Sequence, residues 1–137
     1  MTTRQSAGDG SRILVVDDAE TTRQTISRML EAGGFSVQTA ASGPEALDCL
    51  ARANGSIDLV LSDVTMPGMT GIDLAYEIRD RYPAVPIAIV SGDVSELERS
   101  IIGRAGVPFI KKPFHAESLY SAVREAIRRH PDRAAEH

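Results

Sequence analysis

The chain alternates, along almost its whole length, between short apolar runs and segments with helical periodicity. Five runs of five to seven residues have the pattern of strands, and they lie at 13–17, 35–40, 57–63, 86–91 and 107–111. Three of the runs are almost continuously apolar, as is typical of parallel strands that are buried on both faces. Strands that alternate with helices predict an α/β protein with a parallel sheet.

Apolar residues recur at helical spacing between these runs. The residues expected on the buried helix faces are Thr22, Ile26, Met29 and Leu30; Ala46, Leu47 and Leu50; Ile72, Ala75 and Ile78; Leu97, Ile101 and Ala105; and Leu119, Val123, Ala126 and Ile127. Gly33 and Gly34 stop the first helix, and Pro44 opens the second. Five such units predict a flavodoxin-like, doubly wound five-stranded sheet with five helices. We expect the order 2-1-3-4-5, because the chemistry of the strand ends described below needs strands 1 and 3 to be adjacent.

Length and composition limit the possible classes of protein. A chain of 137 residues suits one domain, which we place at 12–130, after a disordered lead-in at 1–11 and before a tail or linker at 131–137. No apolar stretch approaches the roughly twenty residues that cross a bilayer, and no signal peptide opens the chain, so we expect a cytoplasmic protein. The net charge of −4 and the scattered basic residues argue against direct binding to nucleic acid or membranes.

Polar side chains follow the predicted strands where each one ends. Asp17 and Asp18 follow the first strand, Asp63 ends the third, Ser91 ends the fourth and Lys112 follows the fifth. Ligands bind at this edge of an open parallel sheet, so we expect these groups to converge. Any one Asp at a strand end is common as a turn or cap residue, but three together would repel and raise at least one pKa. A divalent cation relieves that repulsion, and oxygen ligands favour Mg²⁺.

This set of groups indicates phosphoryl transfer. A carboxylate oxygen can attack phosphorus to give an acyl phosphate, while a lysine ammonium and a serine hydroxyl bind the phosphoryl oxygens. We find no acid–base pair and no glycine-rich nucleotide loop in the sequence. The phosphoryl group would therefore arrive already activated, from another protein or a small donor.

Four segments carry a resemblance to a known family. ILVVDDAETTR, DLVLSDVTMPGMTGIDL, IAIVSGD and FIKKPF resemble the signatures of the receiver domain of two-component response regulators, of the chemotaxis-regulator type, across 12–130. The resemblance implies that Asp17 and Asp18 position Mg²⁺, that Asp63 accepts the phosphoryl group, and that the backbone carbonyl of Thr65 completes the metal ligands. It also implies that Ser91 is the switch hydroxyl.

The same resemblance assigns the remaining site residues. Lys112 is the matching lysine because it directly precedes proline, which leaves Lys111 on the surface, and the bond to Pro113 is expected to be cis. Phe109 falls at the aromatic switch position, although an ordinary core phenylalanine would fit the same strand. The segment Met66-Pro67-Gly68 resembles the loop beside the acceptor. The loop before the fifth strand is one residue shorter than in chemotaxis-type receivers, which bears on the partner surface.

The resemblance implies a signalling switch without catalytic turnover. Its expected partners are a sensor histidine kinase or a histidine phosphotransfer protein, and then an effector or a second copy, bound through helix 4, strand 5 and helix 5. Two alternatives stay open. An aspartate-nucleophile, Mg-dependent phosphatase would share the acyl phosphate but requires Asp-x-Asp, where this chain has Asp17-Asp18-Ala19. An inert binding module would lack the acceptor, the acid pair or the lysine.

Overall fold

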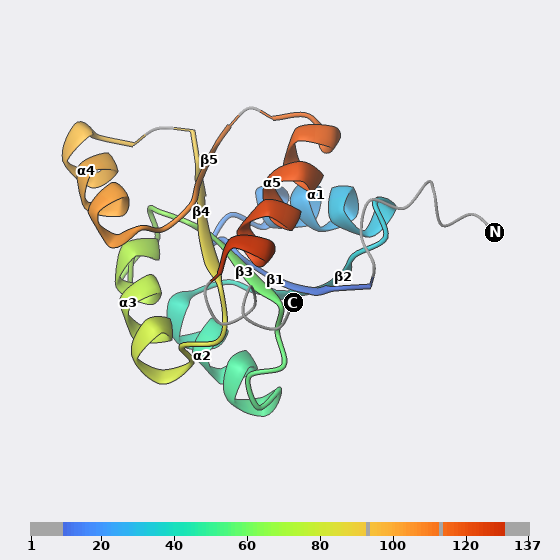
Figure 1. Cartoon of the computed structure of the whole chain (residues 1–137), viewed down its shortest axis with the longest axis horizontal. Helices are drawn as coiled ribbons and strands as arrows, with labels where there is room; N and C mark the ends of the chain where they lie inside the picture. Colours follow the sequence, from blue (N-terminus) through green and yellow to red (C-terminus); the bar gives the residue numbers. More distant parts are fainter. Residues whose placement is uncertain (1–9, 93, 113, 131–137) are drawn as a thin grey trace.

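The computed structural model describes residues 10–92, 94–112 and 114–130 (Figure 1). The strands are β1 (Arg12–Val16), β2 (Ser36–Ala40), β3 (Leu59–Asp63), β4 (Ile87–Ser91) and β5 (Phe109–Lys111). The helices are α1 (Glu20–Ala32), α2 (Gly43–Arg52), α3 (Gly71–Arg81), α4 (Glu96–Ala105) and α5 (Ala116–Arg129). Strands and helices alternate as the sequence pattern predicts.

The five strands form one parallel sheet in the order β2-β1-β3-β4-β5. This confirms the predicted flavodoxin-like topology. The chain reverses its winding direction at β1, so a crevice opens beside the carboxyl ends of β1 and β3. Asp17 and Asp18, which follow β1, and Asp63, which ends β3, lie at this crevice.

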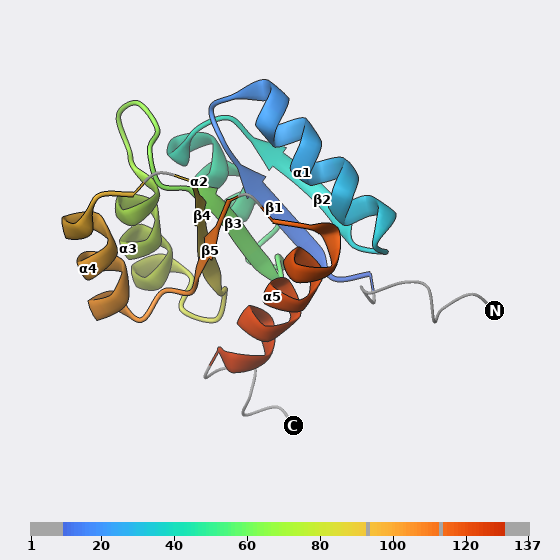
Figure 2. The same cartoon turned by 90° about the horizontal axis from the view of Figure 1, so that it is seen from above.

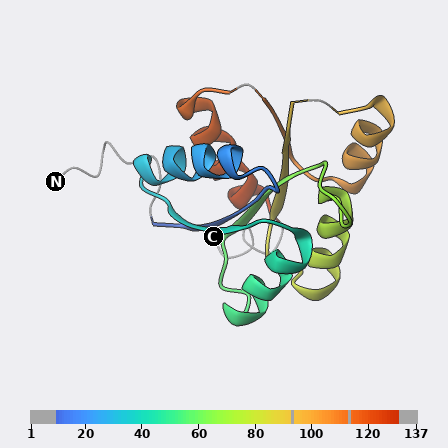
Figure 3. The ribbon, with the colours of Figure 1, turned by 180° about the vertical axis from the view of Figure 1, so that it is seen from behind.

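Helices cover both faces of the sheet. Helices α1 and α5 lie on one face, and α2, α3 and α4 lie on the other (Figures 2 and 3). Side chains alternate along each strand, so β1 contributes Leu14 and Val16 to the core under α2 and α3, and Ile13 and Val15 to the core under α1 and α5. The two hydrophobic cores, one on each face of the sheet, therefore both extend to its carboxyl edge.

Strand boundaries differ slightly from the prediction. Phe35, Ile57 and Val107 are buried, but each precedes its strand by one or two residues. Two residues of the predicted lead-in are hydrogen-bonded: the Gly10 N–H donates to the Gly34 carbonyl, and the Ser11 carbonyl accepts from the Ser36 N–H. Backbone pairing thus begins before β1. The segments 1–9 and 131–137 lie outside the described residues.

The predicted buried face of α4 is partly wrong. Leu97 is 71% exposed, Ile101 and Ala105 are half-buried, and the fully packed residue is Ile102. Two adjacent isoleucines leave the helical phase ambiguous in the sequence. The helix begins after the Ser95 cap, whose hydroxyl accepts from the Glu98 N–H, and it packs on the sheet through Ile102, with Leu97 facing away.

Candidate phosphoryl and metal site

Three carboxylates meet at the carboxyl edge of the sheet. Asp17 and Asp18 follow β1, Asp63 ends β3, and these two strands are hydrogen-bonded neighbours. One carboxylate oxygen from each residue lies within 4.8 Å of the others. Asp17 is buried, Asp63 half-buried and Asp18 exposed, so the cluster opens to solvent on one side. The predicted convergence of these side chains is present.

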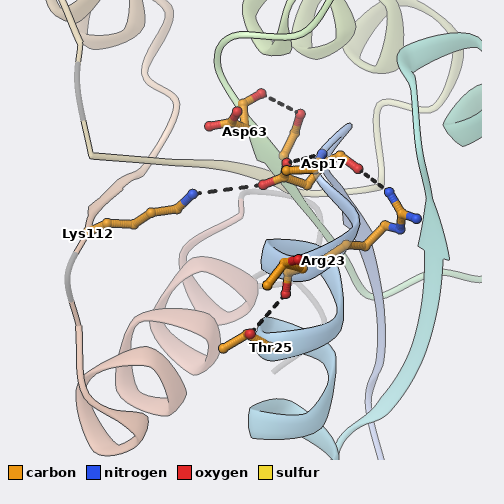
Figure 4. A network of polar contacts seen from close by, with 8 residues as sticks. Asp17, Arg23, Thr25, Asp63 and Lys112 are labelled. Atoms are coloured by element: carbon orange, nitrogen blue, oxygen red, sulfur yellow. Dashed lines mark hydrogen bonds and ion pairs between the residues drawn. The ribbon is translucent and has the colours of Figure 1, made fainter.

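Asp17 is held on several sides (Figure 4). Its Oδ1 accepts from the Ala19 N–H at 2.9 Å, and its Oδ2 lies 3.8 Å from the Lys112 Nζ. Its backbone carbonyl accepts from the Arg23 Nη1 at 2.7 Å. The buried Asp17 carboxylate thus has one backbone N–H donor and one ammonium group as partners.

Burial raises the pKa of Asp63 above its ordinary value of 3.8, and the nearby charge of Asp17 raises it further. The Lys112 ammonium and the Val64 N–H oppose this rise. The sequence predicted that repulsion would raise one pKa in the cluster; the direction is confirmed, although desolvation is the larger cause. A carboxylate in this position gains from any cation that enters the cluster.

The two adjacent lysines have different surroundings. Lys112 reaches the acidic cluster from the end of β5, whereas Lys111 is exposed. The Lys112 N–H donates to the Ser91 carbonyl, so the lysine continues the pairing of β4 with β5 for one residue beyond the strand. The predicted cis bond to Pro113 lies outside the described residues.

The remaining predicted residues flank the cluster. Ser91 ends β4 and is only 4% exposed. Thr65 is exposed in the loop after β3, within the same turn as Met66, which is buried. Phe109 opens β5 and is half-buried, with the Arg99 guanidinium 5.4 Å from the centre of its ring. The roles given to Ser91, Thr65 and Phe109 stay predictions.

The cluster fits a hard divalent cation. All three side chains offer oxygen, and their spacing lets one ion contact one oxygen of each. A site that is open on the Asp18 side leaves room for water ligands, which suits Mg²⁺. Asp17, Asp18 and Asp63 would hold the ion.

Sequence reasoning missed two residues, Arg23 at the acidic cluster and Arg99 against Phe109. Arg23 was part of a motif but was given no role, although it shares the buried stripe of α1 with Ile26 and Leu30 at a spacing of three and seven residues. A charged residue on a core-facing stripe was the available signal. Arg99 gave no such signal, because its contact with Phe109 depends on the phase of α4.

A groove of about 900 Å³ lies away from the acidic cluster. Apolar residues such as Val107, Phe109 and Ala126 line it, and Arg79 and Arg129 add positive charge. It follows the free edge of the sheet from β5 to the second half of α5. It contains none of the carboxylates, so we assign it no part in phosphoryl chemistry.

Comparisons with known proteins identify the family. The family model described as the response regulator receiver domain matches residues 13–124. The sensor kinase CckA of Brucella abortus is 35% identical over 116 residues, which cover 84% of this chain and 12% of that protein. The response regulator MprA of Mycobacterium sp. (strain KMS) is 37% identical over 119 residues, which cover 86% of this chain and 51% of that protein.

Solved structures show the same fold. A response regulator receiver domain protein from Clostridium thermocellum gives a TM-score of 0.78 at 34% identity, covering 87% of this chain and 95% of that one. The chemotaxis protein CheY4 of Vibrio cholerae gives 0.77 at 31% identity, covering 86% and 99%.

The fold and the site together define a doubly wound α/β protein with an acidic cluster at the switch point of its sheet, where such sheets bind ligands. Within that class, the chain belongs to the response regulator receiver domain family of two-component signalling. The aspartate-nucleophile phosphatase alternative is not supported. The chain spans about half the length of the MprA relative and a much smaller part of CckA. No helix in the described part of the chain has the length and apolar character needed to cross a membrane.

Proposed function

We propose that Asp63 accepts a phosphoryl group from the phosphohistidine of a sensor kinase or a histidine phosphotransfer protein. The observation that carries this proposal is the meeting of three carboxylates from β1 and β3 with the Lys112 ammonium from the end of β5. Residues 12–130 act as one receiver unit. The domain is a switch that undergoes phosphorylation and slow self-hydrolysis, and it turns over no external substrate.

The chemistry follows from the groups at the cluster. An oxygen of Asp63 attacks phosphorus in line, and a P–O bond forms as the P–N bond to the donor imidazole breaks. The electron pair of the broken bond stays on the imidazole nitrogen, which takes up a proton. Lys112 moves from Asp17 to a phosphoryl oxygen, and Ser91 donates its hydroxyl to another. Asp17, Asp18 and Asp63, together with the backbone carbonyl of Thr65, would hold Mg²⁺, which would supply positive charge to offset that of the carboxylates and the phosphoryl oxygens.

The proposed output is a change at the face formed by α4, β5 and α5. When Ser91 is drawn towards the phosphoryl group, space opens behind it, and Phe109 rotates inwards from the first position of β5. Phe109 and residues of α5 also line the apolar groove, so the rotation would change the shape of a surface that borders this face and can bind a partner. An effector or a second copy of the chain would read that change.

Phosphorylation by acetyl phosphate tests the acceptor directly. We expect the intact protein to gain one phosphoryl group only with Mg²⁺, and Asp63→Asn to gain none, as measured by mass spectrometry. Asp18→Ala should fold normally, because Asp18 is exposed, yet fail to react. Phosphorylation of Asp18→Ala at the normal rate would show that the metal assignment is wrong.

Amide NMR with and without Mg²⁺ and beryllofluoride, a phosphoryl mimic, tests the output face. We expect shifts around Asp63 and also across 94–130. Shifts confined to the loops around Asp63 would contradict the proposed face while leaving the acceptor assignment intact.

A further inference from the structure

Arg23, near the start of α1, hydrogen-bonds the main chain of the acid pair formed by Asp17 and Asp18. Its Nη1 donates to the Asp17 carbonyl at 2.7 Å, and Figure 4 shows the side chain reaching from the first turns of α1 to the end of β1. The carboxylate of the same aspartate is contacted separately by the Ala19 N–H and by Lys112. Asp17 is therefore fixed through its main chain and through its side chain by different groups.

The Asp17 carbonyl lies where the sheet stops supplying partners. The Asp17 N–H still donates to the Ala40 carbonyl of β2, but the chain then leaves the sheet for α1. Among the described residues, Arg23 is the donor that the structure gives to this carbonyl. Because a peptide group is planar, a fixed Asp17 carbonyl also fixes the orientation of the Asp18 N–H and the line between the Cα atoms that carry the two carboxylates.

The main chain of Arg23 is held in place by the packing and hydrogen bonds of α1. Arg23 shares the core-facing stripe of α1 with Ile26 and Leu30, which pack into the core under α1 and α5. Its N–H donates to the Ala19 carbonyl and its carbonyl accepts from the Ser27 hydroxyl. Arg23 is half-buried on this stripe, and its planar donor fork defines an orientation that a single ammonium does not.

From this geometry we propose that Arg23 is a positioning residue that sets the Mg²⁺ affinity of the acid pair. This inference rests on the proposed function and adds to it a division of roles between two cations. Lys112 is shared between Asp17 and the incoming phosphoryl group, so it releases Asp17 during the reaction. Arg23 acts on the carbonyl and does not release it, so the ligand geometry is kept while Lys112 moves.

The test compares Arg23→Met and Arg23→Lys with Arg28→Met in the whole chain. Arg28 is an exposed arginine on the same helix and serves as the matched control. Isothermal titration gives the Mg²⁺ dissociation constant, and phosphorylation by acetyl phosphate at increasing Mg²⁺ gives the half-saturating concentration and the maximal rate. Thermal unfolding without Mg²⁺ shows whether each variant is folded.

We expect Arg23→Met to weaken Mg²⁺ binding about tenfold, the loss typical of an outer-shell partner of a metal ligand. The half-saturating Mg²⁺ should rise by the same factor while the maximal rate stays near that of the wild type. Arg23→Lys should recover part of the affinity, and Arg28→Met should match the wild type.

Several results would overturn the inference. Wild-type Mg²⁺ affinity in folded Arg23→Met would do so, as would a lowered melting temperature with an unchanged Mg²⁺ requirement, which is the mark of a purely structural role. If Arg23→Met does not fold, Arg23→Lys decides, and wild-type affinity there rejects the inference. Failure of the wild type itself to bind Mg²⁺ or accept phosphate would instead reject the proposed function.

Discussion

At the scale of single residues, the position of Asp63 depends on the absence of a side chain at Gly71. A Cβ at Gly71 would lie closer to the Asp63 carbonyl oxygen than the 3.0 Å that real Cβ atoms keep. The Gly71 N–H donates to the Val64 carbonyl at 2.9 Å, which ties the first turn of α3 to the end of β3. The neighbouring atoms are backbone, so they cannot move aside as a flexible side chain would.

We therefore expect Gly71→Ala to displace the phosphoryl acceptor. The overpacking should lower the free energy of unfolding by about 1–3 kcal/mol. It should also slow phosphorylation by acetyl phosphate. Gly103→Ala is the control, because a Cβ at Gly103 in α4 meets open space and alanine favours a helix by about 1 kcal/mol. Chemical denaturation measures both variants, and equal behaviour of the two would contradict the close-contact argument.

The raised pKa of Asp63 gives a second prediction at this scale. A carboxyl whose pKa is higher in the folded state than in the unfolded state favours folding fully below its unfolded value, and that contribution is lost as the pH rises through the folded pKa. Asp63→Asn removes the charge, so it should melt at a higher temperature than the wild type at neutral pH without Mg²⁺.

Melting curves from acid to neutral pH check the direction of this stability difference. The difference between Asp63→Asn and the wild type should shrink as the pH falls below the Asp63 pKa, because both proteins then carry a neutral group at that position. A difference that stays constant with pH would show that the charge of Asp63 is not its cause.

At the scale of elements, α4 is the helix with the smallest buried face. Ile102 is its one fully buried residue, Leu97 is exposed, and Arg99 rests on the Phe109 ring at the start of β5. An element with few buried contacts has a low local stability and can move without disturbing the rest of the core. This fits its place in the proposed output face.

The Arg99–Phe109 contact should oppose the proposed rotation of Phe109. Cation–π contacts at exposed sites contribute about 0.5–1 kcal/mol, so Arg99→Ala should shift the equilibrium towards the rotated state about two- to fivefold. By linkage, its affinity for beryllofluoride with Mg²⁺ should rise by the same factor. Titration followed by amide NMR measures this, with exposed Arg104→Ala as the control. Unchanged or weaker affinity in Arg99→Ala would show that the contact does not restrain Phe109.

The elements also show what a sequence can and cannot predict. The α/β class and the approximate positions of the strands follow from apolar runs and turn residues, because β1, β3 and β4 are buried along nearly their whole length. The strand order was expected on a different ground, the need to bring the first and third strands together at their acidic ends. The phase of α4 was not predictable, since the choice between Ile101 and Ile102 depends on how the helix meets the sheet. The convergence of Asp17, Asp18 and Asp63 was predictable from topology, but the Arg23 contact depends on one side-chain conformation.

At the scale of the whole molecule, the acidic cluster joins the two core layers. Asp17 and Asp18 lead into α1, which covers one face, and Asp63 leads into α3, which covers the other. An ion held by all three residues would connect both halves of the fold across β1 and β3. Metal binding should therefore raise the free energy of global unfolding and stabilise both halves of the fold together.

This linkage gives the last prediction. A ligand that binds only the folded state stabilises it by about 2.7 kcal/mol at a hundred times its dissociation constant. Thermal unfolding of the wild type should shift upwards with increasing Mg²⁺, and Asp18→Ala should show no shift. Because the ligands must be ionised, the Mg²⁺ effect should disappear as the pH falls through the raised pKa of Asp63. Asp63→Asn, more stable than the wild type without Mg²⁺, should become the less stable protein when Mg²⁺ is saturating. A Mg²⁺ shift of equal size in Asp18→Ala would place the ion elsewhere on the surface.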